Sequence, residues 1–423
     1  MVCAPIRRAC TCCLGVALIP LAVQAEGLLA VDNPARNGAA TGAYAGVEIY
    51  QANDGLSIRQ DGKSWLSGHA RSSGKSLAVL SARAEAGVQW DGFRVGALYR
   101  AEAMVRTNRD AADLVRQYSE GSGYDPGRVY HLDYRISGFE ADGLRVSKTL
   151  QTRLGADWQL DWGMAASWLH GRRVKLETAG GQATAVSTQA YSARPYDADV
   201  SLDSMDSRVD TSGGGRFNPP FGEQPGISGQ GAALDLGLIL RRADGLRLEL
   251  AVNDLAGRMV WKNLPEYAAN YNTATRFYDS RGYVNFRPLI ASQSCYRDLV
   301  QTLEPKLRLA AGYPAGTVAG GALDFLVAVT HAHGSWFPEV GIAFHQASQW
   351  GVSVSYDLRF RTTMIALRYR DLHIGVNSSR IPSSSSSATQ SGAGDTLAGA
   401  TPFSPVAGAS ARCGLAPAGP AGP

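Results

Sequence analysis

Long stretches of this chain alternate strictly between apolar and polar positions. Every second residue from Leu80 to Trp90 is apolar, and the residues between them are polar or glycine. Asp91-Gly92 follows, a pair that accepts the positive φ angles of a tight hairpin turn, and the alternation resumes from Phe93 to Val105. A helix would place apolar residues three and four positions apart, so this pattern predicts a long β-hairpin with one apolar and one polar face.

The same pattern recurs along most of the chain. Alternating segments meet at Asp142-Gly143 and Asp244-Gly245, which predict two further hairpin turns, and a tight turn is predicted over residues 155–157. With two weaker segments included, the pattern predicts fourteen strands. They cover residues 44–50, 80–90, 93–105, 130–136, 144–154, 158–168, 174–188, 234–240, 246–252, 307–313, 323–329, 340–344, 350–358 and 365–376.

Two architectures accommodate such strands. In a soluble sandwich or solenoid the apolar face forms the core, whereas in an outer-membrane barrel it contacts lipid and the polar face lines a lumen. The strands exceed the ~5–6 residues usual in soluble sheets and match the ~9–11 residues that cross a bilayer at a tilt. Aromatic residues near the predicted strand ends resemble the girdles of such barrels: Trp90, Tyr99, Trp158, Trp168, Tyr313 and Trp350. We therefore predict an all-β fold, an antiparallel transmembrane β-barrel of about 14 strands.

The connections fit this prediction if the tight turns share one side. Segments 107–128, 190–230 and 256–304 then form long outer loops, both ends of the barrel lie on the periplasmic side, and the strand count is even. A short helix is expected over Asp110 to Tyr118. The aromatic and amide-rich stretch 262–304 is expected to be a loop, which either packs against its neighbours or folds over the barrel mouth to contact a ligand or partner.

The N-terminus predicts export. Arg7 and Arg8 precede a short apolar core, and Val23-Gln24-Ala25 is typical of a cleavage site, so residues 1–25 are predicted to be a cleaved signal peptide. Residues 26–43 would then be a periplasmic or plug segment, 44–376 the barrel, and 377–423 a disordered Ser/Gly/Ala/Pro-rich tail. The mature chain keeps Cys295 and Cys413, too few for a disulfide framework, and a bridge between them is not expected because Cys413 lies in the tail.

Composition and motifs narrow the function classes. Lys plus Arg is 41 against 37 Asp plus Glu, a near balance that argues against nucleic-acid binding. His131, Asp133 and Ser137 share one strand face but are spaced too widely for a catalytic relay, and His331 and His333 are expected to be solvated rather than metal ligands. No nucleotide-binding or metalloprotease motif occurs, so we expect no enzyme activity, no metal site and no cofactor.

Charged residues alternate with the apolar ones deep within the predicted strands. A charge facing hydrocarbon is costly, so these side chains are predicted to face the lumen. They are Arg83, Glu85, Arg94, Arg100, Glu102, Arg106, Asp133, Arg135, Asp235, Arg241, Arg247, Glu249 and Arg308, together with Arg145, Arg153, Asp161, Lys306, Asp324 and Arg368. Two roles remain open: a network of Arg–carboxylate pairs that stiffens the barrel, or a positive field that selects anions.

Short motifs resemble one superfamily of outer-membrane barrels. Leu234-Asp235-Leu236-Gly237, Val252-Asn253-Asp254-Leu255 and the stretch 305–313 are similar to segments of the long-chain fatty-acid transporters and the TraF-like barrel proteins. Asn33-Pro34-Ala35 is similar to the plug segment of the transporters, and the resemblance implies fourteen strands. This chain has Asp254 where the family usually has a second Asn, and it continues beyond the last strand.

These observations predict a barrel in the outer membrane of a Gram-negative bacterium. The leading hypothesis is a channel or transporter for small, including amphipathic, solutes. A non-transporting structural or assembly barrel of an envelope or conjugation-type apparatus is the first alternative, and a secreted soluble β-rich adhesin the second. The expected partners are outer-membrane lipid, the outer-membrane assembly machinery and a small-molecule substrate, with no nucleic acid.

Overall fold

The computed structural model describes residues 21–22, 31–36, 41–53, 75–120, 125–186, 196–207, 227–278, 280–281, 283–286, 288–318, 320–346, 350–369 and 372–378. Strands dominate these residues, which confirms the all-β prediction. The helices are α2 (Arg109–Glu120), which confirms the short helix expected at residues 110–118, and the single-turn η2 (Pro34–Arg36). Within the described ranges, neither helix has the length and apolar character needed to cross a membrane.

Seventeen strands form one sheet and two form a small separate hairpin. The large sheet contains β1 (Leu21–Ala22), β2 (Gly42–Asn53), β3 (Lys75–Trp90), β4 (Phe93–Asn108), β5 (Val129–Leu154), β6 (Trp158–Ala185), β7 (Tyr196–Asp206), β8 (Ser228–Arg242), β9 (Arg247–Asn253), β10 (Arg258–Asn272), β13 (Ile290–Thr302), β14 (Lys306–Val318), β15 (Gly321–Ala332), β16 (Ser335–Gln346), β17 (Trp350–Asp357), β18 (Thr362–Tyr369) and β19 (Leu372–Ser378). The hairpin contains β11 (Arg276–Tyr278) and β12 (Val284–Phe286).

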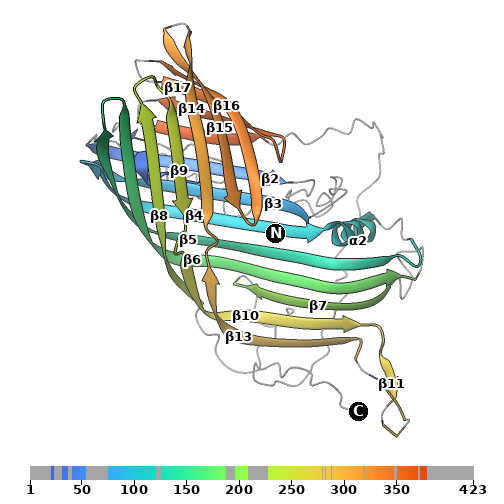
Figure 1. Cartoon of the computed structure of the whole chain (residues 1–423). Helices are drawn as coiled ribbons and strands as arrows, with labels where there is room; N and C mark the ends of the chain where they lie inside the picture. Colours follow the sequence, from blue (N-terminus) through green and yellow to red (C-terminus); the bar gives the residue numbers. More distant parts are fainter. Residues whose placement is uncertain are drawn as a thin grey trace, which may run out of the picture.

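Thirteen of the described strands pair in a continuous circuit, here called the ring. Antiparallel ladders join them in the order β2, β3, β4, β5, β6, β8, β9, β14, β15, β16, β17, β18 and β19. A parallel ladder of β19 with β2 then returns to the start. In Figure 1, β2–β6 run nearly across the view, while β8, β9 and β14–β16 run steeply over them.

The parallel pairing of β19 with β2 differs from two expectations. Gly42 at the start of β2 pairs with Gln89, beside the Asp91-Gly92 turn, whereas Ser378 at the end of β19 pairs with Thr363 at the opposite end of the ring. The two terminal strands therefore start and finish on different sides, and the prediction of both ends on one side was wrong. The thirteen described strands of the ring are an odd number, which a parallel closing pair permits, so the expected even count is not what the described residues show.

Asp142-Gly143 is not a turn, contrary to the prediction. Both residues lie inside β5, and the segments expected at 130–136 and 144–154 form one strand. Gly143 has no positive φ; a Cβ there would lie 1.9 Å from the carbonyl oxygen of Trp168 on β6, so the glycine permits close strand approach. Gly155, with φ +75°, forms the turn between β5 and β6, and Asp91-Gly92 and Gly245 form the other predicted turns.

The connections differ in length between the two ends of the ring. Those between β3 and β4, β5 and β6, β8 and β9, β14 and β15, β16 and β17, and β18 and β19 span two to four residues each. We call this the short-turn end. At the other end, the long-loop end, residues 54–74, 109–128, 186–227 and 254–305 lie between successive ring strands, together with two short turns at residues 333–334 and 358–361.

Strands extend past the ring at the long-loop end and form a second layer, here called the outer sheet. The distal parts of β5 and β6 pair onward with β7, β10 and β13. They lie side by side in the lower half of Figure 1. The stretches expected as loops at 190–230 and 256–304 therefore contain β7, β10 and β13, and that prediction was wrong. β7 does alternate between half-buried and exposed residues, whereas β10 and β13 lack the clean alternation that marks the ring.

A compact apolar cluster joins the outer sheet to the ring. Trp261 on β10 is fully buried and packs with Phe139, Leu169, Met259 and other residues of the same cluster. Its indole Nε1 donates a hydrogen bond of 2.9 Å to Gln301 on β13. A Cβ on Gly171 or Gly229 would lie within 2.4 Å of the Trp261 ring, so both glycines make room for it.

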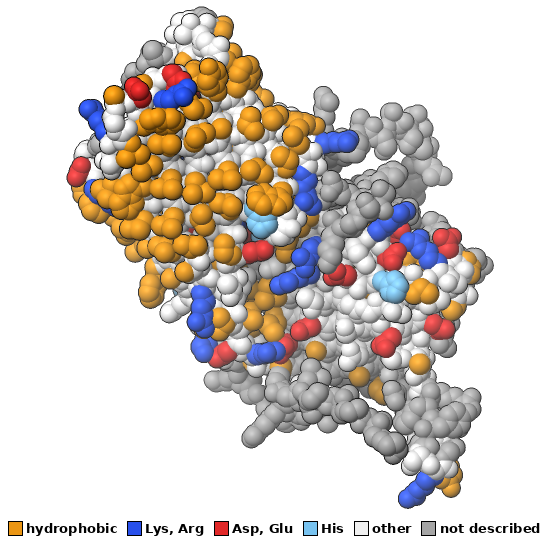
Figure 2. Space-filling view, viewed as in Figure 1, with side chains coloured by type: hydrophobic (Ala, Val, Ile, Leu, Met, Phe, Trp, Pro, Cys, Tyr) orange, Lys and Arg blue, Asp and Glu red, His pale blue; other side chains and the backbone are white. Residues whose placement is uncertain are grey.

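The outer face of the ring is apolar and exposed. Trp168, Leu144 and Val327 expose 64%, 61% and 58% of their surface, and exposed apolar side chains recur along nearly every ring strand. We call this surface the apolar belt. Figure 2 shows these side chains gathered over β8, β9 and β14–β16, whereas charged and polar side chains cover the outer sheet. The polarity of the ring is therefore the reverse of that in a soluble protein, where large apolar residues are buried.

Several predicted segments lie mostly outside the described residues. Of the predicted signal peptide only β1 is described, and it pairs in parallel with the start of β2. Of the predicted segment 26–43, residues 31–36 and 41–43 are described, and the predicted tail lies outside beyond Ser378. Cys295 on β13 is disulfide-bonded, to a cysteine outside the described residues, so the low cysteine count does not exclude a bridge.

Candidate functional site

The charged residues predicted to face the lumen lie mostly on the inner face of the ring. Arg94, Arg100, Asp235 and Arg308 are buried, and the side chains of Arg83, Glu85, Glu102 and Glu249 are about nine-tenths buried. Arg106 is half-buried, and Arg241 and Arg247 are partly exposed. Asp133 and Arg135 lie on the part of β5 nearest the long-loop end, where Arg135 is exposed.

Residues 31–36, here called the inner segment, lie inside the ring. Val31, Asn33, Pro34 and Ala35 are buried, and η2 packs against β5, β6 and β8. The predicted plug motif Asn33-Pro34-Ala35 is thus at the centre of the candidate site. Residues 37–40 connect it to β2 at the short-turn end, so the segment enters from that end.

Backbone hydrogen bonds hold the inner segment in register with the wall. The Asp32 N–H donates to Asn253 Oδ1 at 2.8 Å, and Asn253 Nδ2 donates to the Asp32 carbonyl oxygen at 2.8 Å. The Thr149 hydroxyl donates to the Pro34 carbonyl oxygen at 2.6 Å. Two wall side chains thereby satisfy backbone groups that would otherwise be buried without partners.

Two glycines form the trough in which the segment lies. Gly163 on β6 pairs with Gly237 on β8, and both face inward. A Cβ on Gly163 would lie 2.5 Å from the carbonyl carbon of Pro34, and a Cβ on Gly237 would lie 2.0 Å from Asn33 Oδ1. Any side chain at either position would push the segment away from the wall.

Arg145 is the centre of an ion-pair cluster around Asp32. Its side chain is fully buried and lies 2.6 Å from Asp32, 3.1 Å from Asp235 and 3.5 Å from Glu85. Arg83 lies 2.7 Å from Glu85 and 3.6 Å from Asp32. Burial alone would raise the pKa of Asp32, but the guanidinium groups of Arg145 and Arg83 outweigh that effect and lower the pKa to about 2. Asp32 is therefore a carboxylate at neutral pH.

A second cluster lies next to the first. Arg100 makes a bidentate pair with Asp254, which is buried, and a contact of 2.6 Å with Glu102. Lys306 donates to the other side of the cluster, at Glu102. The Asp254 N–H donates to Asp235 Oδ1 at 3.0 Å, which links the two clusters. Asp254 thus provides the carboxylate that an Asn, the usual residue in the similar family, would lack.

Apolar residues fill the interior toward the long-loop end. Val31 packs with inward-facing residues of β2, β3, β4 and β16, among them Tyr50, Leu77 and Phe337. The Tyr50 hydroxyl donates to Asp357 at 2.8 Å. Together with the ion-pair clusters, this core occupies part of the interior of the ring.

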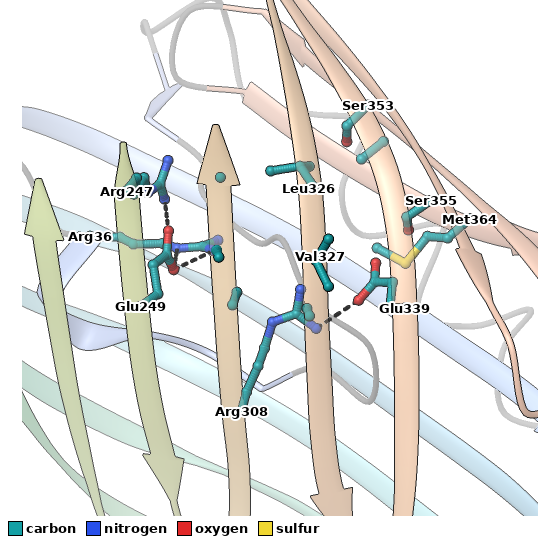
Figure 3. Close-up of a pocket in the computed structure, with 15 residues that line it drawn as sticks. Arg36, Arg247, Glu249, Arg308, Leu326, Val327, Glu339, Ser353, Ser355 and Met364 are labelled. Carbon is teal, nitrogen blue, oxygen red and sulfur yellow. Dashed lines mark hydrogen bonds and ion pairs between the residues drawn. The ribbon is translucent and has the colours of Figure 1, made fainter. Parts of the chain in front are cut away.

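A small cavity remains between the inner segment and the wall of β14–β18. Its volume is about 50 Å³, and Arg36, Arg247 and Arg308 line it with Glu249 and Glu339. Figure 3 shows Arg36 and Arg247 converging on Glu249 from one side, with Arg308 pointing toward Glu339 on the other. The Arg36–Glu249 and Arg308–Glu339 contacts are 2.7 Å and 2.8 Å.

Comparison with known proteins identifies the family but no function. A model of a family of unknown function, DUF5723, matches residues 69–364, more than half of the chain. The chain belongs to the DUF5723 family. No curated protein and no solved structure matches it. The matched DUF5723 region starts ahead of β3 and ends within β18, so the inner segment, β2 and β19 lie outside it. The resemblance to fatty-acid transporters and TraF-like barrels stays a prediction.

Sequence reasoning missed several residues of this site. Asp32 and Arg36 flank the plug motif and hold it to Arg145 and Glu249, and their charges beside an otherwise apolar motif were the available signal. Gly163 and Gly237 interrupt the inward polar positions of their strands, which marks a close backbone approach. Asn253 gave no local signal, because it lies 221 positions from its partner Asp32.

The described residues offer no metal cluster. No three His, Cys, Asp or Glu side chains among them come together as ligands. His333 Nδ1 lies 3.1 Å from Glu304, and the ring of His331 packs against Trp336 instead. The site provides fixed charges and hydrogen-bond donors.

Proposed function

We propose that this DUF5723 chain is a β-barrel of the outer membrane that passes small, including amphipathic, solutes, and that the inner segment closes it. The observation that carries the proposal is the reversed polarity of the ring. Its outer face exposes Trp168, Leu144 and Val327, while Arg145 on the inner face is fully buried. Lipid stabilises the first arrangement, and water or ion pairing stabilises the second.

The height of the apolar belt supports a membrane location. On β6 the outward positions from Trp158 to Trp168 are apolar, and the next two are His170 and Arg172. Ten steps of ~3.3 Å give ~33 Å along the strand, or ~23 Å along the barrel axis at a tilt of ~45°. The apolar band of outer-membrane barrels is ~25 Å tall. Exposed Trp90 and Trp350 at one border and Trp168 and Trp336 at the other are typical of aromatic girdles.

The lengths of the connections support an orientation. Outer-membrane barrels have short periplasmic turns and longer extracellular loops. The short-turn end is then periplasmic, the outer sheet is extracellular, and the inner segment enters from the periplasm. A cleaved signal peptide over residues 1–25 delivers the chain to that compartment.

The nature of the inner segment favours passage over permanent closure. It spans only residues 31–36, belongs to no ring strand, and is held by a few polar contacts over two glycines. Its departure would leave a trough lined by charged groups such as Arg145 and Glu249, which water can enter. The ring strands would keep all the hydrogen-bonded ladders that join them.

Planar-bilayer conductance tests the proposal. The full mature chain should conduct weakly, and a variant lacking residues 26–40, which spares β2, should conduct strongly. A matched control lacks residues 379–412 and should conduct as weakly as the full chain. If neither the full chain nor the N-terminal deletion conducts, and heat-modifiable migration on gels verifies that both are folded, solute passage would be contradicted.

The outer sheet favours a second candidate, a non-transporting structural or assembly barrel. It projects from the ring as a broad polar surface at the long-loop end, more than a simple channel requires (Figures 1 and 2). Mild detergent extraction would then recover the chain in a larger envelope complex. A secreted soluble protein, the remaining alternative, would appear in the aqueous fraction without detergent.

A further inference from the structure

The cavity beside the inner segment is produced by a group of small side chains. Ala310 and Gly312 on β14 lie opposite Glu249 and Arg247 on β9. The lining continues across the wall with Ala328, Ser353, Ser355 and Ala366 from β15, β17 and β18. Five adjacent strands that alternate apolar and charged residues elsewhere are hollowed at this one place.

Guanidinium groups outnumber carboxylates among the residues that line this hollow. Three guanidinium groups, of Arg36, Arg247 and Arg308, lie beside two carboxylates, of Glu249 and Glu339. Arg36 and Arg247 share Glu249, and Arg308 pairs with Glu339.

Two guanidinium N–H groups are buried there without acceptors. Within the described residues, Nε of Arg308 and Nε of Arg247 make no hydrogen bond and are shielded from solvent. The Arg308 side chain is only 10% exposed, and its Nη1 atom is already committed to Glu339 and Thr330. A buried donor without an acceptor is costly, so an acceptor placed in the cavity would be bound favourably.

We propose that this cavity binds a small tetrahedral oxoanion of the phosphate class. Such an anion pairs with guanidinium groups and has oxygens directed to several sides, toward Arg308, Arg247 and the hydroxyl groups of Ser353 and Ser355. A volume of about 50 Å³ admits an anion of this size but excludes a drug-sized ligand, which needs a pocket of ~300–1,000 Å³.

Arg247, at one edge of the cavity, begins β9 directly after the 243–246 turn at the short-turn end and is partly exposed. A small anion can therefore arrive from that side without passing the apolar core at the other end. Binding itself depends only on the cavity. The supply of the anion from the periplasm and the effect of the bound anion on solute passage rest on the proposed function.

Calorimetric titration with inorganic phosphate tests the proposal. The full mature chain, in a zwitterionic detergent, should show saturable binding that chloride at equal ionic strength does not reproduce. Ala328→Leu fills the hollow without removing a charge and should weaken the affinity at least tenfold, and Ser355→Ala should weaken it less. The matched control Ala166→Leu, on the exposed outer face of β6, should bind as the wild type does.

The outcomes separate this site from the proposed function. No saturable phosphate binding by the folded wild type, or equal binding by Ala328→Leu and wild type, would overturn the anion site. If Ala328→Leu fails to fold, equal phosphate binding by Ser355→Ala and wild type would overturn the anion site instead. Phosphate binding together with silence in both bilayer experiments would leave the site standing and overturn passage, and conductance without phosphate binding would do the reverse.

Discussion

Replacing either trough glycine by alanine should loosen the inner segment without removing a charge. Gly163 and Gly237 face each other across β6 and β8, beneath Pro34 and Asn33. The added methyl carbon would lie 2.5 Å from a backbone carbon in the first case and 2.0 Å from a side-chain oxygen in the second. Carbon atoms pack at ~3.5–4.0 Å, so Gly163→Ala requires the segment to move by about 1 Å.

Overpacking of this kind typically costs ~1–3 kcal/mol. The segment is held by the two Asp32–Asn253 hydrogen bonds, the Thr149 hydrogen bond, three ion pairs and the burial of Val31, and each polar contact contributes on the order of 1 kcal/mol. One alanine therefore removes part of the energy that holds the segment. Since ~1.4 kcal/mol is a factor of ten, the released population should rise about 5- to 150-fold, and further in the double variant.

Two assays report this release. A protease added to the purified barrel should cleave within residues 31–36 faster in both variants, and single-channel recordings should show a higher open probability. Gly180→Ala is the matched control on the same strand β6, because the nearest atom to its new Cβ would be 3.7 Å away. Equal cleavage and equal open probability in Gly163→Ala, Gly237→Ala and Gly180→Ala would refute the seating of the segment in the trough.

Three further outcomes follow from the buried contacts. Arg145→Met leaves three carboxylates without their shared cation and should lower the free energy of unfolding by ~3–5 kcal/mol. Arg172→Met, which breaks an exposed pair with Asp142, should change that free energy by less than ~1 kcal/mol. Equal thermal unfolding midpoints of the two variants would contradict this expectation. Trp261→Ala should lower the free energy of unfolding by ~3–5 kcal/mol and accelerate amide hydrogen exchange in β10 and β13 but not in β15. Equally accelerated exchange in all three strands would count against a separate junction between the outer sheet and the ring. The pKa of Asp32 is lowered to about 2 from an ordinary 3.8, so the stabilisation of the inner segment by the Asp32 carboxylate is complete above pH ~4 and lost as the pH falls through ~2. Conductance should therefore rise near pH 2 and stay unchanged between pH 8 and 5.

The ring was largely predictable because one physical rule governs each of its strands. An apolar outer face and a charged inner face impose a period of two, and the segments from Leu80 to Val105 follow it closely enough to identify β3, β4 and their turn. The rule fails where a residue has a second role. Gly143 follows an aspartate as turn glycines do, but it serves close packing against Trp168, and only the tertiary structure distinguishes the two roles.

The outer sheet and the site were less predictable. The strands β10 and β13 bury only a few apolar residues, such as Trp261, among polar ones, so no regular period of two marks them. The inward direction of Arg83, Glu85 and Arg100 could be predicted from alternation, but not their partners, since Asp254 lies 154 positions from Arg100. The place of Asn33-Pro34-Ala35 could be suggested by resemblance alone, because nothing local directs it to Gly163 and Gly237.

The central claim is that the apolar belt touches lipid, and nitroxide labels at two neighbouring positions of β5 test it most directly. Leu144 and Asp142 share the outer face of the strand, with Leu144 inside the belt and Asp142 just beyond it, paired with Arg172. In liposomes, a label at residue 144 should be accessible to oxygen and shielded from a water-soluble nickel complex, and a label at residue 142 should show the opposite. A label at residue 144 that the nickel complex reaches as readily as at 142 would contradict the membrane-embedded barrel.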